Sequence, residues 1–596
     1  MIRTHVLICG GTGCTSSGSL ALKETLEKEL AAKGLTEEVK IVITGCFGLC
    51  ALGPVMIVYP DGTFYSMVKP EDIPEIVDEH LLKGRPVARL EYHEAGEKEA
   101  VSSLSETKFY SKQKRVALRN CGVINPENIE EYIARDGYAA LGKALTEMTP
   151  EDVIKTVLDS GLRGRGGGGF PTGRKWDLAR KLVQGGQKYV ACNADEGDPG
   201  AFMDRSILEG DPHALIEAMA IAGYAIGADE GFVYVRAEYP LAIVRLEAAM
   251  EQARAKGLLG NNIMGTGFSC DMRIKAGAGA FVCGEETALI ESLEGKRGMP
   301  RLKPPFPANS GYKYKPSNIN NVETFANVSW IIVNGGDKFA AMGTPDSKGT
   351  KVFALTGKIN RGGLVEIPMG KTLRDVIYGV GGGIRNDKPF KAVQMGGPSG
   401  GCIPAELLDT VIDYKALGAT GAIMGSGGMV VMDDSTCMVG MAKFFLDFTA
   451  KESCGKCVHC RLGTKRMLEV LSRIVEGNGK EGDIELLEEL CYGIKDGALC
   501  GLGQTAPNPV LTTIKYFRNE YEEHINNKKC PAKECTALLE YTIDADACKG
   551  CTLCAKKCPA NAITGELKGP HIIDQDACIK CGQCITLCRF NAINVG

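Results

Sequence analysis

The chain has 596 residues and a formal net charge of -4. This length exceeds what one hydrophobic core usually serves, so we expect several domains. The small net charge gives no basic footprint for nucleic acid, and no uncharged apolar run reaches the roughly 18 residues that a membrane span needs. The N-terminal segment MIRTHVLICGG has no long apolar region followed by a cleavage site, so we expect a cytoplasmic protein.

Most of the 25 cysteines stand in short-spaced groups, which is typical of metal clusters, whereas scattered pairs would indicate disulfides. Sixteen of them form four sets of four. For an isolated cysteine such as Cys283, a small buried thiol is the simplest interpretation.

Residues 1–90 alternate in the order of a thioredoxin-like domain. The apolar patterns predict a strand at 5–9, a helix at 17–33, a second strand at 39–45 and two strands around the turn at 61–62. The first strand is followed by Cys9 and Cys14, and the second by Cys46 and Cys50. This arrangement resembles the thioredoxin-like 2Fe-2S ferredoxins, and the lack of a CxxC pair disfavours the alternative of a redox-active disulfide.

Residues 91–140 are charged and poor in periodic apolar positions, which predicts a wrapping linker, and its Cys121 receives no function. Helical and strand patterns then alternate over 141–330, which predicts an α/β sheet with a cofactor at the carboxyl ends of its strands.

The most informative stretch of this domain is GLRGRGGGGFPTGRKW, residues 161–176. Its glycines let backbone amides approach an anion, Arg163, Arg165, Arg174 and Lys175 offer positive charge, and a helix is expected to begin at 172 or 173 and to run to 182. The segment before it has helical spacing, so we do not expect an ordinary Rossmann first turn. A flexible glycine linker is the alternative, but such linkers seldom carry four cations.

Polar residues follow two further elements. Asn193, Asp195 and Glu196 end a predicted strand, where they can hydrogen-bond a flavin or a ribose. Glu285 and Glu286 open a predicted helix, where they either bind a cofactor or simply favour the positive end of the helix dipole.

These segments, with NNVET at 320–324, match in wording and order the cofactor segments of the NADH-dehydrogenase flavoprotein family. That family includes the complex I flavoprotein subunit and the diaphorase subunits of soluble hydrogenases and formate dehydrogenases. The resemblance covers nearly the whole chain and implies that FMN and NAD bind to Gly164, Arg165, Gly166, Gly167, Gly169, Phe170, Lys175, Asn193, Asp195, Glu196, Asp198, Gly284, Glu285, Glu286, Phe306, Asn320, Asn321 and Thr324.

Specific roles also follow from this resemblance. The pair Glu285 and Glu286 corresponds to the residues that contact the NADH ribose, and because a carboxylate there repels a 2'-phosphate, we expect NAD in preference to NADP. Phe170, Lys175 and Phe306 correspond to residues that surround the nicotinamide nucleotide. Asp198 departs from complex I relatives, which mostly carry a longer acidic residue there.

Residues 331–424 have short strands and glycine-rich turns that resemble the ubiquitin-like β-grasp insert of the family, for which we expect a scaffolding role. Helical periodicity returns over 425–535. There Cys454, Cys457 and Cys460 stand in a CxxCxxC loop with Cys500 farther along the chain, which is a ligand set for a 4Fe-4S cluster. A zinc site is the alternative.

Residues 536–596 contain the pattern CxxCxxCxxxC twice, as in a two-cluster ferredoxin. In that pattern the fourth cysteine crosses over. One cubane is then expected on Cys548, Cys551, Cys554 and Cys588, and the other on Cys578, Cys581, Cys584 and Cys558.

A group of residues before the ferredoxin repeat forms a candidate zinc site. It comprises His524, Cys530 and Cys535, with Cys491 as the fourth ligand. Linker cysteines without a metal are the alternative.

A hydride carries two electrons and each cluster accepts one, so a flavin between them is the natural converter, and no catalytic residue is expected beyond FMN. Complex I flavoproteins generally lack both terminal cluster modules. With them, the chain resembles the flavin-bearing β subunit of multimeric, electron-bifurcating FeFe hydrogenases or of NADP-reducing relatives.

This resemblance implies a hetero-oligomer with a hydrogen-activating FeFe subunit, a small thioredoxin-like 2Fe-2S subunit and ferredoxin as partners. It also implies FMN, NAD, one 2Fe-2S cluster and three 4Fe-4S clusters. The alternatives are a diaphorase subunit of a formate dehydrogenase and, in another class, a flavin-free electron-relay scaffold.

Overall fold

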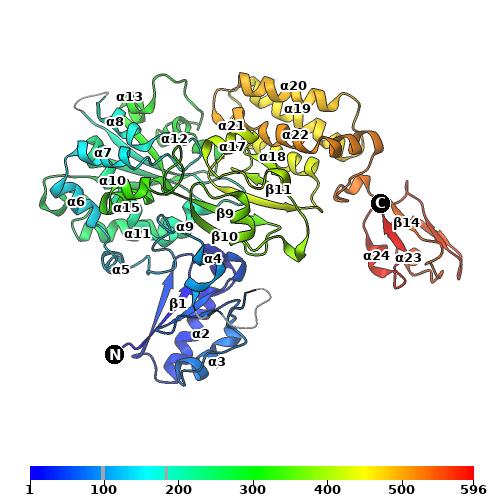
Figure 1. The fold of residues 1–596 in the computed structure, drawn as a ribbon, viewed down its shortest axis with the longest axis horizontal. Helices are drawn as coiled ribbons and strands as arrows, with labels where there is room; N and C mark the ends of the chain where they lie inside the picture. The colour runs from blue at the N-terminus through cyan, green and yellow to red at the C-terminus, as the bar shows by residue number, and fades with distance from the viewer. Residues whose placement is uncertain (95–100, 102, 182–185) are drawn as a thin grey trace. The chain divides into compact units, whose positions relative to one another are not determined.

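A computed structural model describes residues 1–94, 101, 103–181 and 186–596 (Figure 1). The chain divides into two compact units, one of residues 1–388 and 392–431 and the other of residues 389–391 and 432–596. The mixed α/β, multidomain fold class expected from the sequence is confirmed.

The first unit begins with a four-stranded sheet in the order β2-β1-β3-β4. Its strands are β1 (Thr4–Cys9), β2 (Val39–Thr44), β3 (Met56–Tyr59) and β4 (Thr63–Tyr65). Strand β1 pairs in parallel with β2 and antiparallel with β3, and the long helix α2 (Ser19–Ala32) buries Leu22, Leu26 and Leu30 in its core. This is the thioredoxin-like order that the sequence predicts.

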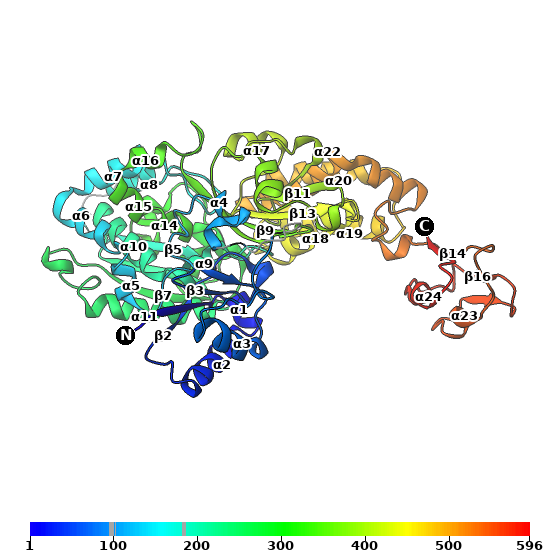
Figure 2. The same ribbon diagram turned by 60° about the horizontal axis from the view of Figure 1, so that its bottom comes forward.

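The second sheet is entirely parallel and has the order β7-β6-β5-β8. Its strands are β5 (Tyr189–Ala194), β6 (Glu230–Arg236), β7 (Asp271–Gly277) and β8 (Ser317–Asn321). Strands β5 and β6 are buried almost throughout, as strands covered on both faces usually are. Helices α10 (Pro212–Ile226) and α11 (Pro240–Ala255) share the core of this domain (Figure 2).

The glycine-rich loop lies between two helices of this domain. Helix α7 (Pro150–Asp159) precedes it, and Thr149 caps α7 in a capping box with Asp152. Helix α8 (Thr172–Lys181) follows the loop, and its predicted end at Leu182 lies outside the described residues.

The third sheet of the chain has the order β10-β9-β13-β11-β12. It consists of β9 (Thr350–Gly357), β10 (Gly363–Pro368), β11 (Phe390–Met395), β12 (Gly401–Pro404) and β13 (Gly428–Asp433). Strand β9 pairs in parallel with β13 and forms an antiparallel hairpin with β10. This order agrees with the β-grasp expectation.

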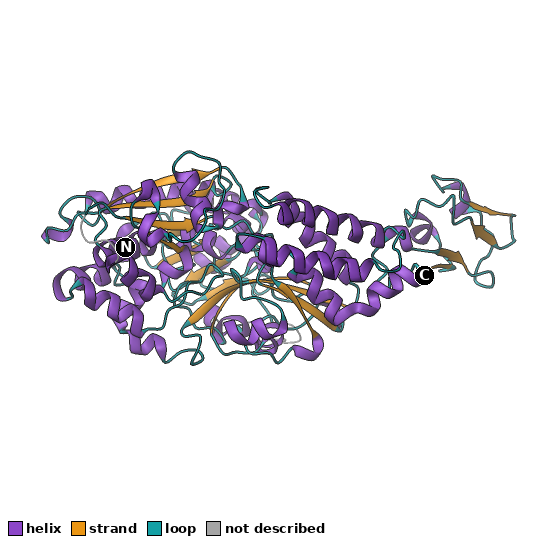
Figure 3. Cartoon of the chain, turned by 90° about the horizontal axis from the view of Figure 1, so that it is seen from above, coloured by secondary structure: helices purple, strands orange, loops and turns teal. Residues whose placement is uncertain are grey.

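The second unit contains a helical bundle, whose long helices run alongside one another (Figure 3). The helices are α18 (Met438–Lys451), α19 (Val458–Val475), α20 (Asp483–Gly497), α21 (Gly501–Thr505) and α22 (Asn508–Glu522). Val470, Leu471 and Leu487 lie in the buried core of the bundle.

The ferredoxin-like segment of the second unit consists of two antiparallel two-stranded sheets and two short helices. Strand β14 (Tyr541–Ile543) pairs with β17 (Ile593–Val595), and β15 (Ile563–Gly565) pairs with β16 (His571–Ile573). The short helices are α23 (Leu553–Lys556) and α24 (Gln583–Leu587). Among the described residues of the whole chain, no helix is long and apolar enough to span a membrane.

Candidate flavin and iron-sulfur sites

The glycine-rich loop doubles back on itself at the start of α8. The Gly164 amide donates to the Phe170 carbonyl oxygen at 2.9 Å, and the Thr172 amide donates to that of Leu162 at 2.8 Å. Gly169 has a φ of +61°, and a Cβ atom there would lie 2.6 Å from the Tyr414 ring. The loop therefore requires glycine at this position.

The tip of the loop fits a phosphorylated cofactor. None of the hydrogen bonds made among the described residues uses the amide N–H of Gly166, Gly167 or Gly168. No heavy atom lies within 4 Å of the position that a Cβ of Gly168 would take. Free amide donors beside open space, next to the beginning of α8, suit an anion such as the phosphate of FMN.

Two arginines of the loop do not serve the anion as the sequence analysis expected. The Arg165 side chain is 0% exposed, and its guanidinium donates to the carbonyl oxygens of Thr350 at 3.0 Å and Lys348 at 2.7 Å. Arg163 donates to the Gly169 carbonyl oxygen at 2.5 Å. Both cations therefore hold the loop in place, and the carbonyl oxygens around Arg165 satisfy its buried guanidinium.

Polar ends of two neighbouring strands lie at the switch point of the parallel sheet, where such folds bind ligands. Asn193 on β5 and Asn321 on β8 are register partners. The Asn193 amide donates to the Gly284 carbonyl oxygen at 2.7 Å and its oxygen accepts from the Asp195 amide at 3.1 Å. Asn321 donates to Asp204 at 2.5 Å.

Asn320 and Thr324 hold the loop and the helix after it. Asn320 accepts from the indole N–H of Trp176 in α8 at 2.9 Å, and the Thr324 hydroxyl accepts from the Arg165 amide at 2.8 Å. The structure thus brings the NNVET segment under the glycine-rich loop.

The two acidic residues after β5 have different environments. Glu196 is buried and accepts from the amides of Asp204 and Arg205, both at 3.1 Å, at the beginning of α9 (Met203–Gly210). Asp198 accepts a short hydrogen bond from Ser426. Burial raises the pKa of Asp198 to about 6, and the Ser426 hydroxyl opposes part of this rise.

Glu285 and Glu286 form a charge network with two lysines. Lys303 lies 2.8 Å from Glu285 and 2.9 Å from Glu286, and Lys175 lies 2.9 Å from the other oxygen of Glu286. Burial alone would raise the pKa of Glu286, but the two lysines outweigh it and hold that pKa at about 2. Glu285 also caps α12 (Glu286–Leu293) by accepting from the Thr287 amide, so the helix-terminus interpretation is correct for one of its oxygens.

Phe170 and Phe306 expose 48% and 56% of their surface, which leaves aromatic faces available for stacking. Several residues that position the site were not found by the sequence analysis. Lys351 in β9 forms a buried ion pair with Glu323, and the Tyr414 hydroxyl donates to the Gly164 carbonyl oxygen at 2.7 Å. A lysine inside an apolar strand was the only signal for the first of these contacts.

The four N-terminal cysteines lie at or after the carboxyl ends of β1 and β2, and none of them forms a disulfide. The Sγ atoms of Cys46 and Cys50 lie 3.8 Å apart, and the Gly48 amide donates to Cys46 Sγ at 3.3 Å. Hydrogen bonds from Cys50 and Cys9 hold the pKa of the Cys46 thiol well below its ordinary value. Close cysteine sulfurs, one of which accepts from a backbone amide, fit an iron-sulfur cluster.

In the CxxCxxC loop of the bundle, Cys454 and Cys457 precede α19 and Cys460 lies in its first turn, while Cys500 immediately precedes α21. Cys457 Sγ accepts from the Leu499 amide at 3.4 Å, which places the loop next to the segment that carries Cys500. The Ser453 hydroxyl lies 3.2 Å from Cys460 Sγ. The donor set fits a 4Fe-4S cluster.

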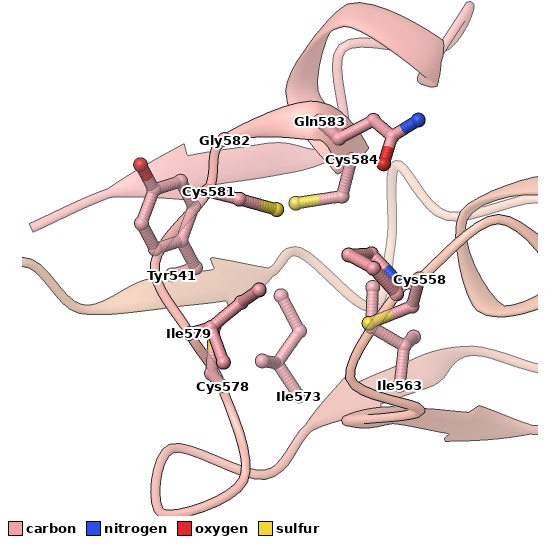
Figure 4. A pocket seen from close by; sticks show the side chains of 11 residues that line it. Tyr541, Cys558, Ile563, Ile573, Cys578, Ile579, Cys581, Gly582, Gln583 and Cys584 are labelled. Atoms are coloured by element: carbon pink, nitrogen blue, oxygen red, sulfur yellow. The ribbon is translucent and has the colours of Figure 1, made fainter.

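Figure 4 shows a cavity in the ferredoxin-like segment whose lining includes three cysteines of the second repeat and one cysteine of the first. These are Cys578, Cys581, Cys584 and Cys558. The grouping is the one that the crossover pattern predicts for one of the two cubanes.

The proposed fourth zinc ligand was wrong. Cys491 is 0% exposed and packs in the apolar core of the bundle. Instead, Cys437 joins His524, Cys530 and Cys535, whose ligand atoms all lie within 4.8 Å of one another. Cys437 could not be predicted as a ligand because it is distant in sequence from the other three residues. It lies at the beginning of α18, where a cysteine can also be explained as the helix cap.

Four family models match separate parts of the chain. They are the Nuo51 FMN-binding domain over residues 157–330, the NADH-ubiquinone oxidoreductase-F iron-sulfur binding region over 440–524, the thioredoxin-like [2Fe-2S] ferredoxin over 1–81, and the 4Fe-4S dicluster domain over 547–593.

Similar proteins cover most of the chain. The NADP-reducing hydrogenase subunit HndC of Solidesulfovibrio fructosivorans is 60% identical over 468 residues, which are 78% of this chain and 95% of that protein. The F 2 subunit of the NADH-quinone oxidoreductase of Rhizobium meliloti strain 1021 is 48% identical over 70% of this chain and 99% of its own length. A chain of the NAD+-reducing [NiFe]-hydrogenase in the H2-reduced state has a TM-score of 0.62 at 30% identity, covering 88% of this chain and 84% of its own.

Proposed function

Because the chain belongs to the family of NADH-binding flavoprotein subunits shared by complex I and hydrogenases, we propose that it is the NAD-side flavin subunit of an electron-bifurcating FeFe hydrogenase. The complex would be a cytoplasmic hetero-oligomer with a hydrogen-activating subunit, a small thioredoxin-like 2Fe-2S subunit and ferredoxin. The observation that carries this proposal is the presence of two terminal cluster modules on one flavin domain.

Bound FMN would accept a hydride from NADH and release its two electrons singly. The residues of this chain would hold that cofactor and the nucleotide. The amides of Gly166 to Gly168 would bind the flavin phosphate, Asn193 and Asp195 would meet the ring or the ribityl chain, and Phe170 and Phe306 would stack on the nucleotide. The family resemblance implies the contact of the two phenylalanines with the nucleotide, and the other roles follow from the chemistry of the residues.

The clusters would provide separate exits for the electrons. We assign the 2Fe-2S cluster to the N-terminal cysteines, one 4Fe-4S cluster to the bundle and two to the ferredoxin repeat, which together require about 14 irons per chain. Iron analysis and EPR of the anaerobically purified chain measure this. A Cys46→Ala chain that kept the whole 2Fe-2S signal would contradict the N-terminal assignment.

The flavin proposal is tested with the purified chain, NADH and a viologen dye. We expect one FMN per chain and dye reduction that depends on it. A Gly168→Ala chain should bind FMN less tightly, because its Cβ would enter the open space of the loop. Gly418→Ala, at an exposed position of α17 (Tyr414–Thr420) with equally open surroundings, serves as a control for expression. A chain with all four clusters and no flavin would instead support the relay scaffold.

NADP reduction is a second candidate, favoured by the name of the 60% identical relative. Lys303 and Lys175 also offset the charge of the two carboxylates that were expected to repel a 2'-phosphate. We retain NAD as the substrate, since both carboxylates remain at the site. Equal dye reduction rates with NADH and NADPH in the unmodified protein would overturn this choice.

We also propose that Cys437, His524, Cys530 and Cys535 hold a structural zinc ion, since one imidazole and three thiols within bonding reach of one centre form a closed tetrahedral set. Elemental analysis should find one zinc per chain in the wild type and in Cys491→Ser, and none in Cys437→Ser. Loss of zinc from Cys491→Ser alone would contradict the assignment.

A further inference from the structure

The loop that carries Cys46 and Cys50 is enclosed by other parts of the first unit. A Cβ atom on Gly45 would lie 2.2 Å from the Cα atom of Gly210 in α9. The Leu364 amide of β10 donates to the Gly48 carbonyl oxygen at 2.8 Å. Residues of α9 and β10 therefore pack directly against this loop.

One such charge is the guanidinium of Arg115, which lies in the segment between the thioredoxin-like domain and the flavin domain. Arg115 Nη1 donates to the Tyr110 hydroxyl at 3.1 Å, and Nη2 donates to the Cys121 carbonyl oxygen at 3.1 Å. The Tyr110 hydroxyl in turn donates a short hydrogen bond to the Phe47 carbonyl oxygen. The Tyr110 hydroxyl therefore links the Arg115 guanidinium to the backbone of Phe47, the residue that follows Cys46.

Two carboxylates near this loop accept hydrogen bonds from backbone amides. Glu366 is buried, and its two oxygens accept from the amides of Ala117 and Leu118, both at 2.9 Å. Glu209 accepts at 2.9 Å from the amide of Thr12, in the loop between the first two cysteines. Arg205, a second cation in α9, pairs only distantly with Glu209, at 3.9 Å, and its guanidinium carbon lies 5.7 Å from the centre of the Phe202 ring.

We propose that Arg115 raises the reduction potential of the N-terminal 2Fe-2S cluster. Reduction adds one electron to the cluster, and a fixed positive charge near the loop that carries the ligands stabilises the more negative, reduced form. The Gly48 amide, which donates to Cys46 Sγ, acts in the same direction. The inference rests on the proposed ligation of the cluster by Cys46, and it makes Arg115 a tuning residue that acts through Tyr110 and the loop backbone.

The test is a redox titration of the 2Fe-2S EPR signal in the full chain, recorded at a temperature where the 4Fe-4S signals are broadened. Arg115→Gln should give a more negative midpoint than the wild type, and Arg115→Lys, which keeps the charge, should stay close to it. The matched control is Arg3→Gln, an exposed arginine before β1, which is separated from Cys9 by a strand about 20 Å long. Its midpoint should not move.

An Arg115→Gln chain that keeps its full 2Fe-2S signal at the wild-type midpoint would overturn the inference. So would an Arg115→Lys chain shifted as far as the glutamine variant, because the effect would then come from geometry and not from charge. If Arg115→Gln does not retain the cluster, the midpoint is measured in Glu366→Gln instead. Removal of this nearby negative charge should make the midpoint less negative, and an unchanged midpoint would contradict the inference. Loss of the 2Fe-2S signal from Cys46→Ala is scored separately, because it tests the ligation itself.

Discussion

Replacing Lys351 with methionine should loosen the flavin site, because it leaves the carboxylate of Glu323 buried without its cation. The two side chains are 0% and 2% exposed. Lys351 Nζ also donates to the carbonyl oxygens of Val352 at 2.8 Å and Ser426 at 2.6 Å. Burial raises the pKa of Glu323 even in the wild type, and Lys351 limits that rise.

Removing one partner of a buried ion pair costs about 3–5 kcal/mol. This cost corresponds to a roughly 150- to 4,000-fold increase in the local opening equilibrium. Hydrogen exchange measured by mass spectrometry on peptides covering 317–330 and 350–357 reports that equilibrium directly. We expect faster exchange in both peptides and a lower FMN content.

Two controls separate charge from packing. The double variant Lys351→Met with Glu323→Gln removes both charges and should recover much of the lost protection, because no ion then remains uncompensated. Lys358→Met changes an exposed lysine just after the same strand and should leave exchange unchanged. Wild-type protection in Lys351→Met, or a double variant as unprotected as the single one, would refute this reasoning.

Three further results are expected. The pKa of Glu286 is lowered to about 2 from 4.5, so its stabilising contribution is fully present above about pH 4.5 and is lost as the pH falls toward 2. In thermal scans recorded at several pH values, the temperature of flavin release should therefore fall less steeply at acid pH in Glu286→Gln than in the wild type. The same variant should use NADPH better relative to NADH, which steady-state dye reduction measures. The pKa of Asp198 is raised from 3.8 to about 6, so the stability of the wild type relative to Asp198→Asn should fall as the pH rises from 3.8 to 6 and stay level above pH 6. The same pH dependence of stability in both proteins would contradict the raised pKa of Asp198.

The parts of the site that could be predicted from the sequence are those whose residues stand close together along the chain. Cys454, Cys457 and Cys460 fall in one loop because a cubane needs several ligands from one short segment. The glycines around Gly168 are equally local, since each permits a close backbone approach at its own position.

Contacts between segments that are distant in sequence could not be predicted from such local motifs. Arg165 was expected to bind the cofactor, but its guanidinium donates to carbonyl oxygens at and just before the beginning of β9, which no spacing in the sequence reveals. Cys437 lies far from His524 along the chain, so only the fold of the bundle brings them together. Likewise, the cation of Lys351 could be assigned to Glu323 only after the β-grasp sheet had been placed against the flavin domain.

The measurement that most directly tests the central claim is an anaerobic assay of the whole native complex with hydrogen as the electron donor. We predict that ferredoxin is reduced only when NAD is present, because bifurcation at the single flavin obliges the two exits to be used together. Ferredoxin reduction at the same rate without NAD would contradict the bifurcating role and leave a plain diaphorase. A complex that is inert to hydrogen and active with formate would contradict the hydrogenase assignment.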